Sequence, residues 1–267
     1  MQTQTPIQCK ETALITGAAS GIGYELACIF AAKNYDLVLV DRNEFKLLEI
    51  AIDFKEKFDT LVTTIIKDLS VPSSSAEIFA ELQKDQIKVD VLVNNAGFGT
   101  YGLFNETNLI TELEMLQVNL VCLTHLTKLF LKDMVNQGKG RILNVSSAAA
   151  FQPGPLMAVY FASKAYVLSF SEAIANELEN TGVNVTVLCP GSTVSAFHER
   201  TGMANSKLLK GKNMMDAKTV AQMGYDGLMK GQTIVVPGLV NKILAKLVGF
   251  FPRNWVTKVV RSMQEDK

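Results

Sequence analysis

The sequence TALITGAASGIG occupies residues 12–23 and joins an apolar run to three closely spaced glycines. The run is short and aliphatic, as in a buried strand, and a segment of helical period follows it from Tyr24 onward. Glycine permits a tight turn and lets backbone N–H groups come close to a bound group. The stretch therefore predicts a strand, a glycine-rich turn and a helix in direct succession.

The same alternation of strand and helix continues along the chain. Apolar runs predict strands at Ala13–Thr16, Leu37–Val40, Leu61–Ile66, Val89–Val93, Arg141–Val145, Val183–Leu188 and Thr233–Val236. Helical periods occupy Ile22–Lys33, Glu44–Phe58, Ser74–Lys84, Thr111–Gln137, Ala158–Asn180 and Ala217–Lys230. Near-continuous apolar strands separated by helices indicate a parallel sheet covered on both faces. We expect one doubly wound α/β domain of about seven strands over residues 1–267.

Composition and charge exclude several classes of protein. The 26 basic and 26 acidic side chains give a formal net charge of zero, so no nucleic-acid partner is expected. The cysteines show no CxxC pairing and the two histidines lie in no ligand cluster, which argues against a disulfide framework and a metal site. The N-terminus has no apolar signal region and no apolar stretch is long enough to cross a bilayer. A cytoplasmic protein is expected.

The glycine-rich turn is a candidate nucleotide site. Backbone N–H groups of such a turn, together with the N-terminus of the next helix, stabilise a pyrophosphate. An ordinary strand-to-helix turn is the alternative, but the position directly after the first strand favours the nucleotide site. Cofactor contacts are expected at Gly17, Ser20, Gly21, Ile22 and Gly23.

The G-x-x-x-G-x-G spacing resembles that of the short-chain dehydrogenase/reductase family. Further motifs follow in the family's order over residues 12 to about 236: Asp68, Asn94-Asn95-Ala96-Gly97, Asn119, Ser146-Ser147, Tyr160-x-x-x-Lys164 and Pro190-Gly191. The resemblance implies a Rossmann-like sheet and an oxidoreductase that moves a hydride between NAD(P)(H) and a carbonyl or alcohol. It also implies cofactor contacts at Asp68, Leu69, Asn95, Ala96, Gly97, Tyr160, Lys164, Pro190, Gly191 and Thr193. Asp68 has the alternative role of a helix N-cap.

Tyr160 and Lys164 are four residues apart, so on a helix they project from one face. A nearby ammonium favours the phenolate and is expected to lower the pKa of Tyr160 from its usual value of about 10. Tyr160 then donates a proton to a reduced oxygen or removes one from an alcohol. The alternative for such a pair on its own is an exposed helical contact.

The resemblance completes a catalytic set of Asn119, Ser147, Tyr160 and Lys164. It assigns Ser147 to the substrate oxygen, with Ser146 as a rival, and Asn119 to a proton-relay water. The alternative for Asn119 is a polar group packed inside its helix. Thr193 is expected to contact the nicotinamide carboxamide, with Ser195 standing where the family often has threonine.

The second predicted strand ends at Asp41, whose carboxylate can accept hydrogen bonds from a ribose and repel a 2′-phosphate. The next residue, Arg42, stands where the family often has a base that stacks on adenine and pairs with the phosphate of NADP; a solvated residue at a helix start is the alternative. Ser20 stands where a base would strengthen the case for NADP. We expect NAD in preference to NADP, with Asp41 and Arg42 both at the cofactor.

Two segments lie outside the regular alternation. Residues 195–216 follow a strand and are expected to form a substrate lid. Residues 239–262 form an amphipathic extension with apolar side chains at helical spacing beside lysines and arginines. Packing on the same domain or a partner subunit is favoured for this extension, and contact with a membrane surface is the alternative.

A mostly apolar pocket is expected at the substrate end. Its candidate lining residues are Phe98, Tyr101, Phe104, Phe151, Leu156, Met157, Phe197 and the methionines within residues 203–215. We therefore expect a bulky, apolar carbonyl or alcohol substrate. We also expect the chain to form a homodimer or homotetramer. The rival function is a non-catalytic nucleotide-binding regulatory or scaffold protein with the same fold.

Overall fold

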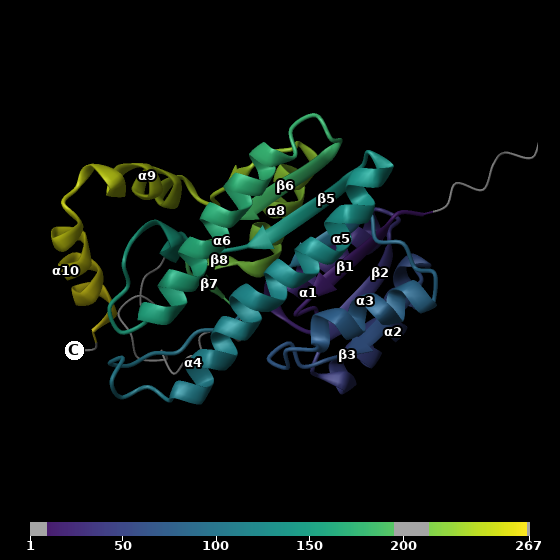
Figure 1. The fold of residues 1–267 in the computed structure, drawn as a ribbon, viewed down its shortest axis with the longest axis horizontal. Coiled ribbons are helices and arrows are strands. Elements are labelled where there is room, and N and C mark those ends of the chain that lie inside the picture. Colours follow the sequence, from purple (N-terminus) through teal and green to yellow (C-terminus); the bar gives the residue numbers. More distant parts are fainter. Residues whose placement is uncertain (1–9, 195–213, 266–267) are drawn as a thin grey trace, which may run out of the picture.

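A computed structural model describes residues 10–194 and 214–265, and Figure 1 shows how their elements are arranged. The strands are β1 (Thr12–Thr16), β2 (Asp36–Asp41), β3 (Val62–Ile66), β4 (Val91–Asn94), β5 (Gly140–Val145), β6 (Val183–Leu188), β7 (Thr193–Val194), β8 (Met215–Asp216) and β9 (Ile234–Val235). The α-helices are α1 (Gly21–Ala32), α2 (Glu44–Phe58), α3 (Ser74–Lys84), α4 (Leu109–Leu116), α5 (Leu123–Gln137), α6 (Ala158–Glu177), α8 (Ala217–Met229), α9 (Leu239–Leu247) and α10 (Arg253–Gln264).

Seven of these strands form one parallel sheet in the order β3-β2-β1-β4-β5-β6-β9. The order reverses direction between β1 and β4, where neighbouring connections leave toward opposite sides of the sheet. A ligand of a doubly wound sheet binds at such a point, outside the carboxyl ends of the strands. The predicted Rossmann-like α/β fold is confirmed.

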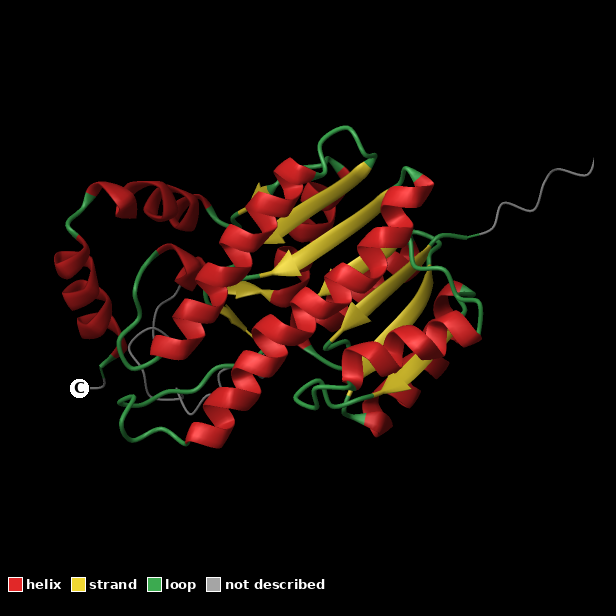
Figure 2. Cartoon of the chain, in the orientation of Figure 1, coloured by secondary structure: helices red, strands yellow, loops and turns green. Residues whose placement is uncertain are grey.

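Helices cover both faces of the sheet (Figure 2). On one face α1, α2 and α8 pack against the strands around Leu26, Phe30 and Leu228. On the other face α3, α5 and α6 pack around Ile78, Leu126 and Ile174. Because both faces are buried, the strands consist of near-continuous apolar runs, and this is the pattern that the sequence showed.

The described residues depart from the predicted elements in two places. The helix expected over Thr111–Gln137 contains a π-helical segment, Gln117–Cys122, between α4 and α5. A π-turn adds one residue to a helical turn, a change that apolar periodicity does not reveal. The extension over 239–262 forms two helices, α9 and α10, separated by a short 3₁₀ turn at Val248–Phe250 and by Pro252, which lacks the N–H that a continuous helix needs.

A buried row of polar side chains ties the sheet to the helices on one face. Asn94 at the end of β4 donates to Thr127 of α5 at 3.0 Å and to the Asn144 side chain of β5 at 2.9 Å. Asn144 in turn donates to Ser171 of α6 at 2.9 Å. These bonds fix α5 and α6 relative to the strand ends that carry the candidate site.

Candidate active site

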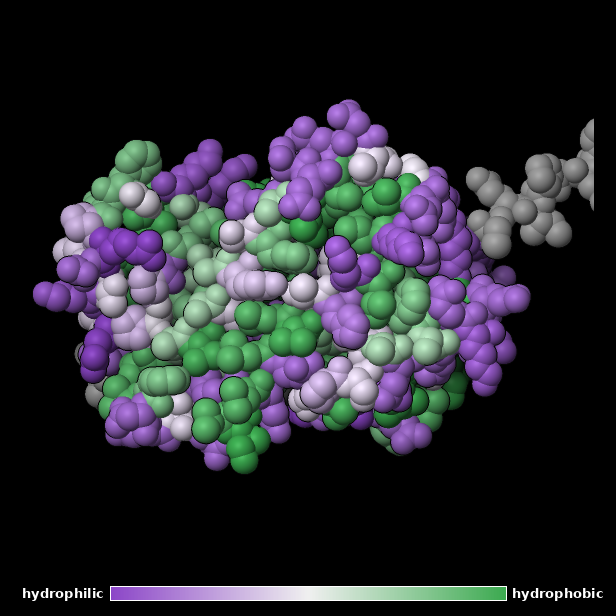
Figure 3. All heavy atoms as spheres, viewed as in Figure 1, coloured by the Kyte–Doolittle hydropathy of each residue, from purple (hydrophilic) through white to green (hydrophobic). Residues whose placement is uncertain are grey.

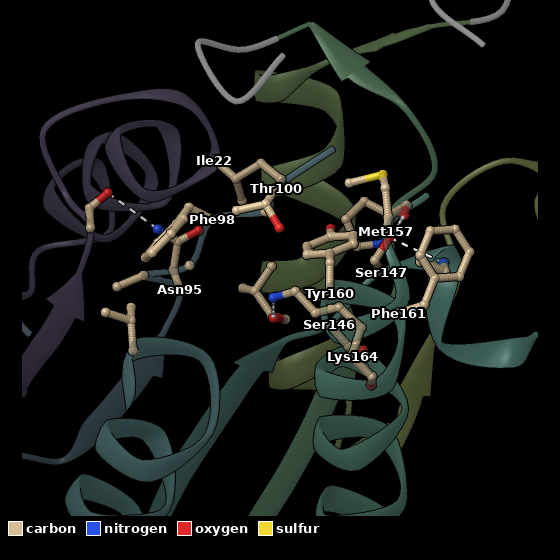
Figure 4. Close-up of a pocket in the computed structure, with 18 of the residues that line it drawn as sticks. Ile22, Asn95, Phe98, Thr100, Ser146, Ser147, Met157, Tyr160, Phe161 and Lys164 are labelled. Atoms are coloured by element: carbon tan, nitrogen blue, oxygen red, sulfur yellow. Dashed lines mark hydrogen bonds between the residues drawn. The ribbon is translucent and has the colours of Figure 1, made fainter. Parts of the chain in front are cut away.

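A pocket of about 1050 Å³ opens at the carboxyl ends of the central strands (Figure 4). It brings together most of the residues predicted for the site: Gly17, Ser20, Gly21, Ile22, Asp41, Arg42, Asp68, Leu69, Asn95, Ala96, Gly97, Ser147, Tyr160, Lys164, Pro190, Gly191 and Thr193. Two predicted residues, Gly23 and Asn119, do not line it. The parallel arrangement explains the clustering, since all these strands end at one edge.

The backbone conformation of the glycine-rich turn leaves room for another group to come close to it. Gly17 and Gly21 have φ angles of +66° and +58°, in the left-handed region that favours glycine. Asn95 donates from its side chain to the carbonyl oxygens of Thr16 at 2.9 Å and Gly17 at 3.2 Å, which holds the turn against the end of β4. A Cβ at Gly23 would clash with the Gly17 carbonyl oxygen, so the packing of the turn requires glycine there. Its contact with a cofactor stays a prediction.

The N-terminus of α1 points to an anion site. Its N-cap residue, Ser20, makes no side-chain hydrogen bond to the first turn, so the backbone donors there are not capped by that side chain. Such donors and the helix dipole favour a phosphate group. The glycine turn, the helix start and the size of the pocket therefore fit the pyrophosphate of a dinucleotide.

Asp41 faces the glycine turn from the end of β2. Its two carboxylate oxygens accept hydrogen bonds from the backbone N–H of Ala19 at 3.1 Å and of Asn43 at 3.0 Å. These bonds orient the carboxylate at the end of the pocket beside the glycine turn and leave each oxygen a further lone pair.

Arg42 and Asp68 form the rim of the same end. The guanidinium of Arg42 lies 3.8 Å from the carboxylate of Asp68, and both side chains are exposed. Burial raises the pKa of Asp68, but hydrogen bonds from the backbone and hydroxyl of Ser70 outweigh it and hold that pKa below its usual value. The N-cap of α3 is Ser73, so the alternative role of Asp68 as a helix cap is not the one observed.

Tyr160 lies in the first turn of α6 and is buried, with 8% of its surface exposed. Burial raises its pKa to about 12, and a hydrogen bond with Ser147 opposes this rise. Lys164 lies one turn further on, with its ammonium 5.8 Å from the centre of the Tyr160 ring and donating to the Val145 carbonyl oxygen at 2.9 Å. Burial lowers the pKa of Lys164 to about 8.

The expected lowering of the Tyr160 pKa by Lys164 is therefore not found in the protein alone. The physical reason is that burial disfavours the charged form of both groups, raising the pKa of a phenol and lowering that of an amine. At neutral pH the structure presents a protonated phenol, which is the form that donates a proton.

The two serines after β5 have different roles. The hydroxyl of Ser146 donates to the Lys164 carbonyl oxygen at 2.7 Å and thereby holds α6. Ser147 accepts from the Ala149 N–H at 3.1 Å and contacts Tyr160, with both side chains in the pocket of Figure 4. Both serines line the pocket, but only Ser147 is hydrogen-bonded to Tyr160, and its role at the substrate oxygen stays a prediction.

Asn119 lies in the π-helical segment and is buried. Its side chain accepts from the Phe98 N–H at 3.1 Å and donates to the Phe98 carbonyl oxygen at 2.9 Å and to Ser163 at 3.0 Å. This amide therefore holds the segment after β4 against α6. Its role with a proton-relay water stays a prediction.

The substrate end of the pocket is largely apolar. Phe98, Tyr101, Phe151 and Met157 line it as expected, whereas Phe104 is exposed and Leu156 is not among the lining residues. Phe197 and Met203, like Ser195 and most of the predicted lid over residues 195–216, lie outside the described residues.

Sequence reasoning missed Gln264 of α10, which also lines the pocket. It is fully buried, and within residues 10–194 and 214–265 neither polar atom of its side chain has a hydrogen-bond partner. The Tyr101 hydroxyl donates to its backbone carbonyl oxygen at 2.7 Å. No motif marks this residue, because only the folding back of α10 brings it to the pocket.

The chain matches the short chain dehydrogenase family over residues 11–205 and belongs to it. A very-long-chain 3-oxoacyl-CoA reductase from Pyrenophora tritici-repentis is 30% identical over 264 residues, covering 95% of this chain and 76% of the relative. The family resemblance predicted from the motifs is confirmed, and the chain is an oxidoreductase of this class.

Two solved structures are similar over nearly the whole chain. A short-chain dehydrogenase from Sphingobium yanoikuyae in complex with NADPH has a TM-score of 0.82 and 28% identity, covering 96% of this chain and 98% of that one. A bulky-bulky ketone specific alcohol dehydrogenase from Comamonas testosteroni has a TM-score of 0.78 and 27% identity, covering 96% of each chain. The NADPH complex of the first of these neighbours supports a nicotinamide dinucleotide as the cofactor.

Proposed function

We propose that this protein reduces a bulky, apolar ketone, or oxidises the corresponding alcohol, with NAD(H) and with Tyr160 as the general acid or base. The observation that carries the proposal is the buried Tyr160 phenol, which contacts Ser147 and has Lys164 one helical turn away. All three side chains line the pocket that also contains the glycine turn.

The nicotinamide, when bound, supplies the hydride for reduction or accepts it in the reverse direction. Gly17, Gly21 and the start of α1 would hold the pyrophosphate, Asp41 the adenosine ribose, and Thr193 the carboxamide. Ser147 would donate a hydrogen bond to the substrate carbonyl oxygen and orient it toward the Tyr160 hydroxyl. Lys164, fixed by the Val145 carbonyl, would stabilise the phenolate left after Tyr160 gives up its proton.

Two features support a bulky, apolar substrate. The phenyl rings of Phe98 and Phe151 and the side chain of Met157 form the wall on the substrate side. One structural neighbour is described as specific for bulky-bulky ketones, and one sequence relative reduces very-long-chain 3-oxoacyl-CoA.

Replacing Tyr160 by Phe tests the mechanism. The substitution keeps the ring and removes the proton, so turnover should fall by roughly a hundredfold to ten-thousandfold. The measurement is a screen of aryl and long-chain ketones with NADH and NADPH, following absorbance of the reduced ring. Binding of the cofactor, measured by calorimetry, is the control and should persist. Unchanged turnover would overturn the assigned role of Tyr160, and bound cofactor without turnover on any ketone would favour the scaffold function.

Replacing Asp41 by Ala tests the preference for NAD. Loss of the carboxylate removes its repulsion of a 2′-phosphate, so the preference for NADH over NADPH should fall by roughly tenfold. Asp41→Asn is the matched control for shape: it removes the charge but keeps an acceptor for the Ala19 N–H. The proposal of NAD is wrong if the unaltered protein already binds NADPH more tightly than NADH.

Location and assembly remain proposals. Within residues 10–194 and 214–265, the structure has no helix whose length and apolar character would let it span a membrane. We propose a cytoplasmic protein that assembles as a homodimer or homotetramer. Contact of the C-terminal helices with a membrane is likewise a proposal, and the exposed side chains of α9 and α10 carry it.

A further inference from the structure

The two C-terminal helices lie at one end of the molecule (Figure 1) and expose many large apolar side chains. No residue of α9 is buried. Phe250, in the turn between the helices, is 84% exposed, and Trp255 is 53% exposed. The exposed large apolar side chains of the segment are Leu239, Val240, Ile243, Leu244, Leu247, Phe250, Phe251, Trp255, Val259 and Met263.

Both helices are nevertheless attached to the rest of the protein. In α10, Val256 is buried and Val260 packs against the buried cluster that contains Met157 and Tyr160. In α9, Asn241 donates to the Pro237 carbonyl oxygen at 2.9 Å, and its side chain lies where a Cβ on Gly191 would be. The exposed apolar residues therefore belong to helices that are packed against the rest of the protein.

Helical spacing separates the attached stripe from the exposed one. On α10, Val256, Val260 and Gln264 are four residues apart and face inward, and Trp255, Val259 and Met263 form the next stripe. On α9, Leu239, Ile243 and Leu247 repeat in the same way. The Trp255 ring packs on Phe251, with ring centroids 5.1 Å apart, yet much of both outer stripes stays exposed. Removing these side chains from water would be favourable.

The charged side chains of this segment are all positive. Residues 239–264 contain five basic side chains and no acidic one, in a chain whose formal net charge is zero. Arg261 pairs with Glu265 at 2.6 Å, whereas Lys242, Lys246, Arg253 and Lys258 form no salt bridge with a described residue. The apolar stripes are thus bordered by unneutralised positive charge.

We propose that α9 and α10 bind the surface of an anionic lipid bilayer, lying in the plane of the interface. The apolar stripes would enter the boundary between headgroups and acyl chains, while the lysines and arginines contact lipid phosphates. Trp255 and the two phenylalanines have the amphipathic or apolar rings suited to that depth. A second copy of the chain fits less well, because a symmetric contact would bring two basic surfaces together.

The position of α9 links this surface to the pocket. Asn241, Leu244 and Ala245 line the pocket that contains Tyr160. Docking of α9 on a bilayer would bring one wall of the substrate chamber to the lipid surface, so that apolar substrates enter from the membrane. This consequence rests on the proposed function, whereas the binding of lipid does not.

Trp255 is the only tryptophan of the chain and lies on the proposed surface, so its emission reports the contact directly. We expect vesicles of phosphatidylcholine mixed with phosphatidylserine to shift this emission to shorter wavelength and to sediment the full-length protein. Vesicles of phosphatidylcholine alone should do so much less, and added salt should weaken binding to the mixed vesicles.

Reversing charges tests whether vesicles bind at α9 and α10 or are attracted by the charge of the whole protein. The double substitution Lys242→Glu and Lys246→Glu should weaken binding to the mixed vesicles by at least about tenfold. Lys55→Glu with Lys84→Glu, on exposed positions of α2 and α3, changes the net charge equally and should leave binding unchanged.

Three results would overturn the proposal: no emission shift with anionic vesicles, equal weakening by both double variants, or a Trp255 emission that depends on protein concentration without lipid, which would indicate a second copy on this face. Tyr160→Phe should bind vesicles as the unaltered protein does. Failure of the proposed catalytic role is therefore distinguishable from failure of membrane binding.

Discussion

At the scale of single residues, Lys164 shows how the fold sets the chemistry of a side chain. Its ammonium is buried, and the loss of water disfavours the charged form. One hydrogen bond, donated to the Val145 carbonyl oxygen, offsets part of this effect. The pKa of Lys164 is consequently lowered to about 8. A lysine with this pKa still carries its charge at neutral pH, which the proposed role beside Tyr160 requires, and it loses that charge in mildly alkaline solution.

The sign of this shift gives a prediction for stability. Above pH 8 the unfolded chain binds a proton at Lys164 that the folded protein has released, so stability rises with pH until the unfolded lysine also titrates near its usual pKa. Relative to Lys164→Met, the unaltered protein should gain on the order of 1–3 kcal/mol in free energy of unfolding between about pH 7 and about pH 10. Denaturant unfolding at several pH values measures this difference, and a difference independent of pH would contradict the lowered pKa.

At the scale of elements, the site depends on how α5 and α6 are held against the sheet. The buried chain of amides and hydroxyls from Asn94 through Asn144 to Ser171 connects two strands to these helices. The π-helical segment directly before α5 places Asn119 against the Phe98 backbone and Ser163. These contacts set the distance between the segment after β4 and the first turns of α6, where Tyr160 lies.

Removing the centre of this polar row should destabilise the fold. Asn144→Ala takes away an acceptor of Asn94 and the donor to Ser171 in a fully buried place, and should cost about 2–3 kcal/mol in free energy of unfolding. Thermal unfolding measures the effect. Asn184→Ala, at an exposed position of the neighbouring strand β6, is the control and should change stability little. Equal stability of both variants would show that the row does not tie the layers together.

At the scale of the whole molecule, exposed apolar side chains gather over α4 and the π-helical segment that follows it (Figure 3). Leu109, Ile110, Leu113 and Val121 are each at least half exposed on this face. Unlike α9 and α10, these helices are not bordered by basic residues alone, since Glu114 is exposed among them. This surface is suited to contact with a second copy of the chain.

We therefore predict that the homodimer or homotetramer forms through α4 and the π-helical segment Gln117–Cys122. Light scattering after size exclusion should give two or four times the chain mass of 29.2 kDa. Val121→Asp places a charge in the contact and should reduce the mass, while the helical circular dichroism stays the same. A monomer for the unaltered protein would contradict the predicted assembly.

The amino-acid sequence alone was enough to predict the sheet, the glycine turn and the pairing of Tyr160 with Lys164. These features are local: apolar runs, glycine spacing and a four-residue interval each leave a direct mark on the order of residues. The sequence also indicated an amphipathic extension after the last strand. It favoured packing of that extension on the same domain or on a partner subunit, with a membrane surface as the alternative.

Only the tertiary structure decided the surroundings of the individual side chains. It showed the phenol of Tyr160 to be buried, so that desolvation outweighs the hydrogen bond with Ser147 and raises its pKa, and it gave Ser146 and Ser147 different partners. It brought Gln264 to the pocket and left α9 without a buried residue. Burial and hydrogen-bond partners depend on contacts between distant segments, and no local spacing encodes these contacts.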